Sequence, residues 1–143
     1  MKKFIRTALT FSALLSALFV SGCKGGGKEY TGDYHYDTEY GVYGVKVSVE
    51  VQNGIIKDVD ILDSNYQEVT DVWDGKENYL AHREDLLKSF EGKTVEEVLS
   101  YTVAKEADGE PTQVSASGLK LITGATLCSG RLILAVQDAL SKI

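Results

Sequence analysis

The stretch of the chain with the richest side-chain chemistry reads ITGATLCSGRL, residues 122–132. It places hydroxyls and a thiol close together, at Thr123, Thr126, Cys128 and Ser129. An apolar pattern of helical period follows, which predicts a helix start. Free backbone N–H groups and the positive end of the helix dipole suit a phosphate there, and Gly124 and Ala125 would let a ligand reach the backbone. An ordinary N-cap at Thr126 or Ser129 explains the same residues, and local chemistry does not separate the two.

The thiol raises a second question, because the chain has only two cysteines. Residues 1–22 have a basic start, an apolar stretch too short to span a bilayer, and small residues before Cys23. This pattern is typical of a bacterial lipoprotein signal peptide, in which Cys23 is lipidated; an ordinary secretory signal or an uncleaved anchor is the alternative. A lipidated Cys23 leaves Cys128 unpaired, either buried and inert or present for its chemistry.

The charge of the chain excludes nucleic acid as a partner. The formal net charge is −6, and removal of residues 1–22 takes away three basic residues and no acidic ones, which leaves −9. Such a surface repels phosphate backbones. Residues 23–29 hold the lipidated cysteine and a glycine-rich flexible tether. Residues 30–143 remain for a single domain, enough for one modest core.

Alternating apolar and polar residues predict strands at 33–40, 45–52 and 55–62. Helical patterns predict helices near 79–90, 95–101 and 128–142, the second with a capping box from Thr94 to Glu97. Residues 105–114 contain Pro111 and predict a loop, and 118–123 predict a short strand. The fold class that follows is α+β, a small antiparallel sheet with helices packed on one side.

The Asn53-Gly54 pair predicts a hairpin between the second and third strands. A two-residue turn would place Asp58 opposite Val49 and bring acids onto the apolar face. A three-residue loop, 52–54, keeps that face apolar and is therefore the predicted turn, with a bulge at Gly54 and the pairs Val51–Ile55, Val47–Val59 and Val45–Ile61.

Outside residues 122–132 the candidates for chemistry are weak. His35 lies on the polar face of a predicted strand, and His82 lies among acids on a charged helix face, so no metal site is predicted. No Gly-x-Ser-x-Gly elbow is present. The tyrosines at 30, 34, 36, 40 and 43, with Trp73, could stack on a planar ligand or simply cover one side of a sheet. A solute-binding lipoprotein that uses this tyrosine face is one functional alternative.

The segment Thr123-Gly124-Ala125-Thr126-Leu127-Cys128 resembles the Ser/Thr-Gly-Ala-Thr/Ser-x-Thr/Ser motif of FMN-binding domains. These domains occur in subunits of the sodium-translocating NADH:quinone oxidoreductase and the Rnf complex, and in small lipoproteins of extracytoplasmic electron transfer. Residues 43–49 and 53–59 resemble the opening hairpin of the family, 90–93 its middle segment, and 131–143 its final helix. The resemblance covers about residues 40–143.

The resemblance implies a bound FMN, held by the motif and by the first residue after it: Thr123, Gly124, Ala125, Thr126, Leu127, Cys128 and Ser129. In the family a flavin transferase moves FMN from FAD onto the hydroxyl at the last motif position, through a phosphoester. Here that position is Cys128, and a thiol would require a weaker sulfur–phosphorus bond. Three alternatives follow: non-covalent FMN, Ser129 as the acceptor, or a domain that keeps the fold without flavin.

Together these features predict an extracytoplasmic FMN-binding lipoprotein, lipid-anchored at Cys23 to the cell membrane. It would carry electrons to or from a membrane oxidoreductase and lacks evident catalytic residues of its own. The alternative from another class is a non-redox binding or interaction lipoprotein with the same fold.

Overall fold

The computed structural model describes residues 26–143. The predicted signal peptide, the predicted lipidation site Cys23 and the first part of the tether lie outside these residues. The elements in chain order are β1 (Lys28–Thr38), β2 (Gly41–Gln52), β3 (Ile55–Leu62), α2 (Lys76–Lys88), α3 (Val95–Leu99), β4 (Thr102–Lys105), β5 (Pro111–Ser115) and α4 (Thr126–Leu140). Between residues 26 and 143, no helix is both long and apolar enough to cross a membrane.

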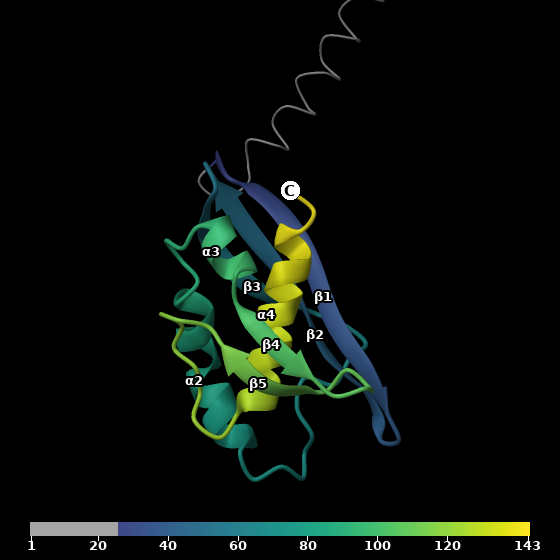
Figure 1. Ribbon diagram of the computed structural model, residues 1–143. Coiled ribbons are helices and arrows are strands. Elements are labelled where there is room, and N and C mark those ends of the chain that lie inside the picture. Colours follow the sequence, from purple (N-terminus) through teal and green to yellow (C-terminus); the bar gives the residue numbers. More distant parts are fainter. Residues whose placement is uncertain (1–25) are drawn as a thin grey trace, which may run out of the picture.

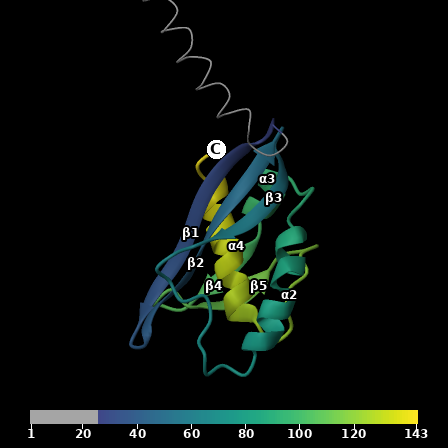
Figure 2. The ribbon, with the colours of Figure 1, turned by 180° about the vertical axis from the view of Figure 1, so that it is seen from behind.

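The predicted α+β fold is confirmed. Strands β1, β2 and β3 form an antiparallel sheet in that order, and β4 pairs with β5 in a separate hairpin. Helix α4 lies between the two, with the sheet behind it and the β4–β5 hairpin in front (Figure 1). The view from behind shows the sheet covering α4, with α2 to one side (Figure 2). The core joins the apolar face of β2 to the apolar side of α4 and includes Val47, Val49, Leu132, Ile133 and Val136.

Two glycines let α4 approach both of its neighbours closely. A Cβ at Gly32 of β1 would overlap backbone atoms of Ala135 and Ala139 in α4. On the opposite side, a Cβ at Gly130 of α4 would lie 2.7 Å from Cβ of Pro111 in β5. The helix is therefore held at backbone contact distance from the sheet and close to the hairpin, which fixes where its first turn lies.

The predicted turn between β2 and β3 is wrong. The structure has a two-residue turn in which Asn53 and Gly54 both have positive φ, 53° and 73°, as the mirror-image type I′ turn requires. The register then shifts by one residue between Val51↔Ile56 and Glu50↔Asp58. This bulge brings Val59 opposite Val49 and Ile61 opposite Val47, so it restores the apolar face two residues beyond the turn.

Several predicted boundaries also change. Strand β1 begins at Lys28, inside the predicted tether, because Lys28 and Glu29 pair with Val51 and Glu50. Residues 105–114 are not a loop throughout, since Pro111 begins β5 and pairs with Lys105. Residues 118–123 form turns and irregular chain rather than a strand. The capping box before α3 is confirmed, with the Glu97 N–H donating to Thr94 Oγ1 at 3.0 Å.

The close contact at Gly32 generates a stability prediction. Gly32→Ala is expected to lower the free energy of unfolding by about 1–3 kcal/mol, because the added methyl group must push α4 away from β1. Urea unfolding of the variant and the parent measures the difference. Thr31→Val is the matched control, since its exposed side chain points to the other side of the same strand and is expected to change stability by less than about 0.5 kcal/mol. Equal stability of Gly32→Ala and the parent would contradict the contact.

Candidate functional site

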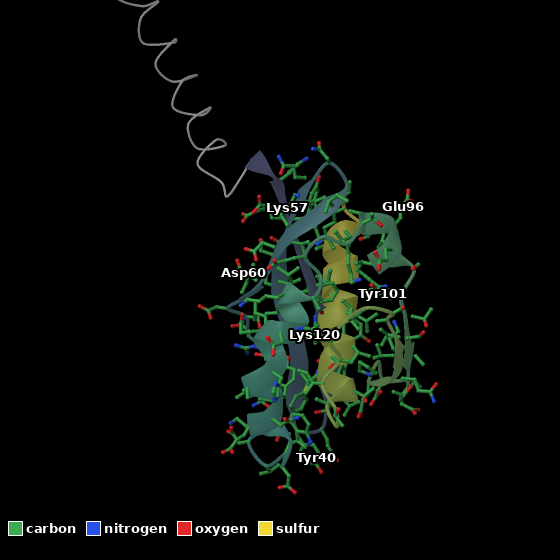
Figure 3. All side chains as sticks on the ribbon, turned by 90° about the vertical axis from the view of Figure 1, so that its left-hand side faces the viewer. Tyr40, Lys57, Asp60, Glu96, Tyr101 and Lys120 are labelled. Carbon is green, nitrogen blue, oxygen red and sulfur yellow. The ribbon has the colours of Figure 1, made fainter. Side chains whose placement is uncertain are left out.

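A pocket of about 1000 Å³ opens at one end of the molecule, where the β1–β2 turn, the start of α4 and residues 69–73 meet. Tyr40 marks this end in Figure 3, whereas Lys57, near the β2–β3 turn, lies at the other end. Strand β1 runs between the two ends, about 30 Å at about 3.3 Å per residue. The pocket is thus separated from Lys28, where the sheet begins, by the length of β1.

The start of α4 forms one wall of the pocket. Of the seven residues implied by the family resemblance, Gly124, Ala125, Thr126, Leu127 and Cys128 line it. Ala125 is the N-cap and no side chain caps the helix, so the predicted cap at Thr126 or Ser129 is wrong. Gly124 has φ 77° and nothing within 4 Å of the position a Cβ would take, which leaves open space beside the backbone. This wall offers uncapped backbone N–H groups and the positive end of the dipole of a 15-residue helix.

Thr123 and Ser129, the other two residues of the predicted set, do not line the pocket. Ser129 is 1% exposed, and its buried Oγ has no hydrogen-bond partner within the described chain. The carbonyl oxygen of Thr123 accepts from Asn78 Nδ2 of α2 at 3.3 Å, which ties the loop before α4 to that helix. Ser129 is therefore not placed to accept a group from a ligand in this pocket.

Aromatic side chains form the facing wall. Tyr36 and Tyr43 lie directly opposite each other in the β1–β2 pairing, with ring centroids 6.5 Å apart. Tyr40 in the intervening turn is 77% exposed at the rim, and Trp73 lines the pocket from the segment before α2. The structure thus brings three of the five predicted tyrosines to the pocket together with Trp73; Tyr30 and Tyr34 do not line it.

The segment between β3 and α2 is irregular, but specific contacts hold it. Gln67 pairs with β2 beyond the end of β3, with its N–H donating to Val42 at 2.9 Å and its carbonyl accepting from Gly44 at 3.0 Å. Glu68 accepts from the Tyr79 hydroxyl at 2.7 Å and from Arg83 Nη1 at 2.6 Å. Burial and the Glu68 carboxylate raise the pKa of Tyr79, so this hydroxyl stays a donor. These contacts place Trp73 beside the pocket.

Arg131 and Cys128 form the inner end of the pocket. Arg131 lies one turn after Cys128 in α4 and is 5% exposed, and its Nη2 donates to Cys128 Sγ at 2.9 Å. Its guanidinium carbon lies 5.8 Å from the ring centroids of both Tyr36 and Tyr43, within the range of cation–π attraction. Arg131 is the only basic residue among the residues that line the pocket.

The outer rim is acidic. Asp37 comes from the end of β1, Glu39 from the β1–β2 turn, and Asp108 and Glu110 from the loop between β4 and β5. The Tyr34 hydroxyl donates to the carbonyl of Gly109 at 2.5 Å and holds this loop against β1. The two parts of the pocket therefore differ in charge. Arg131 and the N-terminus of α4 provide positive charge, and the rim provides four carboxylates.

Neither Cys128 nor the two histidines offer the pocket an activated nucleophile or an imidazole base. Burial raises the pKa of the Cys128 thiol, although Arg131 opposes the shift, so the thiol is neutral at pH 7 and a poor nucleophile. His35 stacks on Tyr66 and bonds to Asp33, and His82 is exposed on α2; neither lines the pocket. Residues 26–143 contain no group of three or more metal-ligating side chains.

Comparison of the chain with protein families, with curated proteins and with solved structures finds no match.

Sequence reasoning missed Arg131. The signal was present, because Arg131 falls three residues after Cys128 on the same side of a helix whose other residues there are apolar. A cation on the apolar side of a helix indicates either a buried partner or a ligand. The acidic rim was not predictable from local sequence, since its carboxylates come from two segments about 70 residues apart.

The raised pKa of Cys128 generates a prediction of pH dependence. Below the ordinary thiol pKa of 9.0, both the folded and the unfolded chain hold the proton and pH has no effect through this group. Above it, the unfolded chain releases the proton first, so unfolding becomes easier up to the folded pKa. The stability of the parent relative to Cys128→Ser is expected to fall by up to about 1.4 kcal/mol per pH unit above about pH 9.

Urea unfolding of both proteins with reductant, at about pH 7.5 and about pH 10, measures this difference. The tyrosines with raised pKa are present in both proteins and cancel. A difference in stability that does not change with pH would show that the thiol ionises equally in both states.

Proposed function

We propose that this protein is an extracytoplasmic lipoprotein, anchored to the cell membrane through Cys23, that binds FMN without a covalent bond and carries electrons. The observation that supports this best is the position of the Thr123–Cys128 motif. Its Gly-Ala-Thr core begins α4 at the wall of a large pocket, with aromatic rings facing it. The motif, the helix start and the aromatic wall are separate features of the sequence, and they meet in one place.

The residues present fit the chemistry of a flavin. The pocket volume, about 1000 Å³, lies at the upper end of the range typical of ligand pockets. Tyr36, Tyr43 and Trp73 offer apolar faces to a planar ring system, and the start of α4 offers N–H groups to a phosphate. A bound flavin supplies one- and two-electron transfer, while the protein supplies binding, orientation and exclusion of water. Tyr36, 8% exposed, is the most buried of the aromatic residues that line the pocket and is suited to exclude water from such a ring.

Non-covalent binding is favoured by the state of the motif's last residue. Cys128 is 3% exposed, its thiol is neutral, and its sulfur already accepts from Arg131. Ser129 is buried and does not line the pocket, so it does not offer a second acceptor there. At the position where the family resemblance places the phosphoester, the pocket therefore offers a buried, neutral thiol in place of a hydroxyl.

The position of the pocket suits a tethered carrier. A lipid at Cys23 would hold the start of β1 toward the membrane, and the pocket lies at the opposite end of that strand. The exposed rim, including Tyr40, would then face a partner rather than the lipid surface. A membrane oxidoreductase with a domain that extends from the bilayer is the kind of electron partner this geometry accommodates.

A second candidate function is a non-redox binding lipoprotein. The four rim carboxylates favour it, because they repel a phosphate as it enters and would attract a cationic ligand. The tyrosine face and the motif line the same pocket. Substitutions in either would therefore weaken ligand binding under both candidate functions and would not distinguish them. Flavin binding itself is the measurement that separates them.

The first prediction concerns binding. The full chain, purified from membranes in detergent, is expected to quench the fluorescence of added FMN saturably, because Tyr36, Tyr43 and Trp73 would lie against the ring. Trp73→Leu is expected to weaken both the quenching and the affinity. Thr112→Ser, on the exposed surface of β5, is the control and is expected to leave both unchanged. Absence of flavin absorbance after purification, together with absence of binding on titration, would refute the proposal.

The second prediction concerns attachment. Cys128→Thr restores the hydroxyl of the family motif, and co-expression with a flavin transferase is expected to give a protein heavier by one FMN less water. The parent and Cys128→Ala are expected to show no added mass and no in-gel flavin fluorescence after denaturation. Covalent flavin on the parent would contradict non-covalent binding.

A further inference from the structure

Arg131 is a buried cation without a buried anion. Its side chain is 5% exposed, and no carboxylate of residues 26–143 lies within the 4.0 Å that defines an ion pair. Two partly buried cations of the fold do form ion pairs: Arg83 with Glu68 at 2.6 Å and Lys93 with Glu97 at 2.9 Å. Arg131 is thus exceptional in being more deeply buried than either and unpaired.

The contacts that Arg131 does make hold it in place without neutralising it. The thiol of Cys128 is a weak, uncharged acceptor and uses one nitrogen of a guanidinium that carries five N–H donors. The faces of Tyr36 and Tyr43 attract the cation but leave its charge uncompensated. A buried charge is costly unless it is paired, so a pocket that keeps one in a fixed position is suited to an anionic ligand.

The direction of the pocket's charge agrees with this. Arg131 lies on the same wall as the uncapped first turn of α4, and both favour negative charge. Two of the rim carboxylates, Glu110 and Asp108, lie near enough to Tyr36 to raise its pKa, which burial also raises and Arg131 opposes. An anionic group is therefore repelled at the rim and attracted at the inner end.

We infer that Arg131 binds the phosphate of FMN and replaces, with a charge-assisted contact, the covalent bond that Cys128 cannot form. Cys128 is the positioning residue, because its sulfur holds the guanidinium toward the pocket. This inference rests on the proposed flavin function. The inference gives Cys128 a role. Cys128 lacks the hydroxyl needed for covalent attachment, and it also orients Arg131, which binds the phosphate instead.

The test compares FMN with riboflavin, which has the same ring system and lacks the phosphate. The full chain in detergent is titrated with each by flavin fluorescence. The parent is expected to bind FMN more tightly than riboflavin. Arg131→Met is expected to weaken FMN binding by about tenfold to a hundredfold, the range for loss of a charged hydrogen-bonded contact, and to change riboflavin binding by less than about threefold. Arg131→Lys keeps the charge without the planar guanidinium, and its affinity for FMN is expected to lie between those of the parent and Arg131→Met.

A structural role for Arg131 would give a different result. Replacement of an unpaired buried cation by Met, of similar volume, is expected to leave the melting temperature of the ligand-free protein unchanged or to raise it. The inference would be overturned if Arg131→Met lowered the affinities for FMN and riboflavin equally, or if the parent bound both equally well. Either result would leave the proposal of flavin binding standing. Failure of the parent to bind either flavin would refute the proposed function and the inference with it.

The positioning role of Cys128 has its own pair of variants. Cys128→Ser keeps an acceptor for the Arg131 N–H and is expected to retain the preference for FMN over riboflavin within about threefold. Cys128→Val removes the acceptor at similar volume and is expected to reduce that preference about as far as Arg131→Lys does. A full preference in Cys128→Val would show that the thiol does not orient the guanidinium.

Discussion

The close packing of α4 between the sheet and the β4–β5 hairpin is the constraint on which the rest of the structure depends. Backbone contact at Gly32 sets the distance from β1, and contact at Gly130 sets the distance from β5. With both sides fixed, the first turn of α4 has one position, beside the β1–β2 turn. The pocket exists because three irregular segments, the β1–β2 turn, residues 69–73 and the loop before α4, surround that first turn.

The pocket in turn depends on charge placement. The start of α4 forms one wall, Arg131 lies at the inner end, and four carboxylates lie at the rim. Tyr36 is close to charges of both signs, because its ring lies beside Arg131 and its pKa responds to Glu110 and Asp108. Such an arrangement would suit a ligand that has an anionic end and a planar, apolar end. The flavin proposal and the role inferred for Arg131 are two consequences of this one arrangement.

The β2–β3 hairpin shows where sequence reasoning failed and why. The apolar alternation on each strand was correct, and the requirement for one apolar face was also correct. The error was to put the extra residue in the turn. Asn53 and Gly54 both adopt positive φ, which favours the two-residue turn, and the chain corrects the register with a bulge beside Lys57 instead. Turn chemistry and face pattern are separate constraints, and only the folded hairpin shows how both are met.

The sequence by itself determined most of the strands predicted at 33–40, 45–52 and 55–62, although Glu39 and Tyr40 lie in the turn after β1. It also determined the helix that follows the motif, the capping box at Thr94 and the α+β class, because each depends on local periodicity or local capping. It also drew attention to residues 123–128 through their side-chain chemistry. Tertiary structure alone decided that Gly124 to Cys128 line the pocket together with Tyr36 and Tyr43, whereas Ser129 is buried outside it. It also decided that Arg131 is buried without a carboxylate within ion-pair distance among the described residues. These facts depend on contacts between segments far apart in the chain, whose geometry is set by backbone approach at Gly32 and Gly130 rather than by any local pattern.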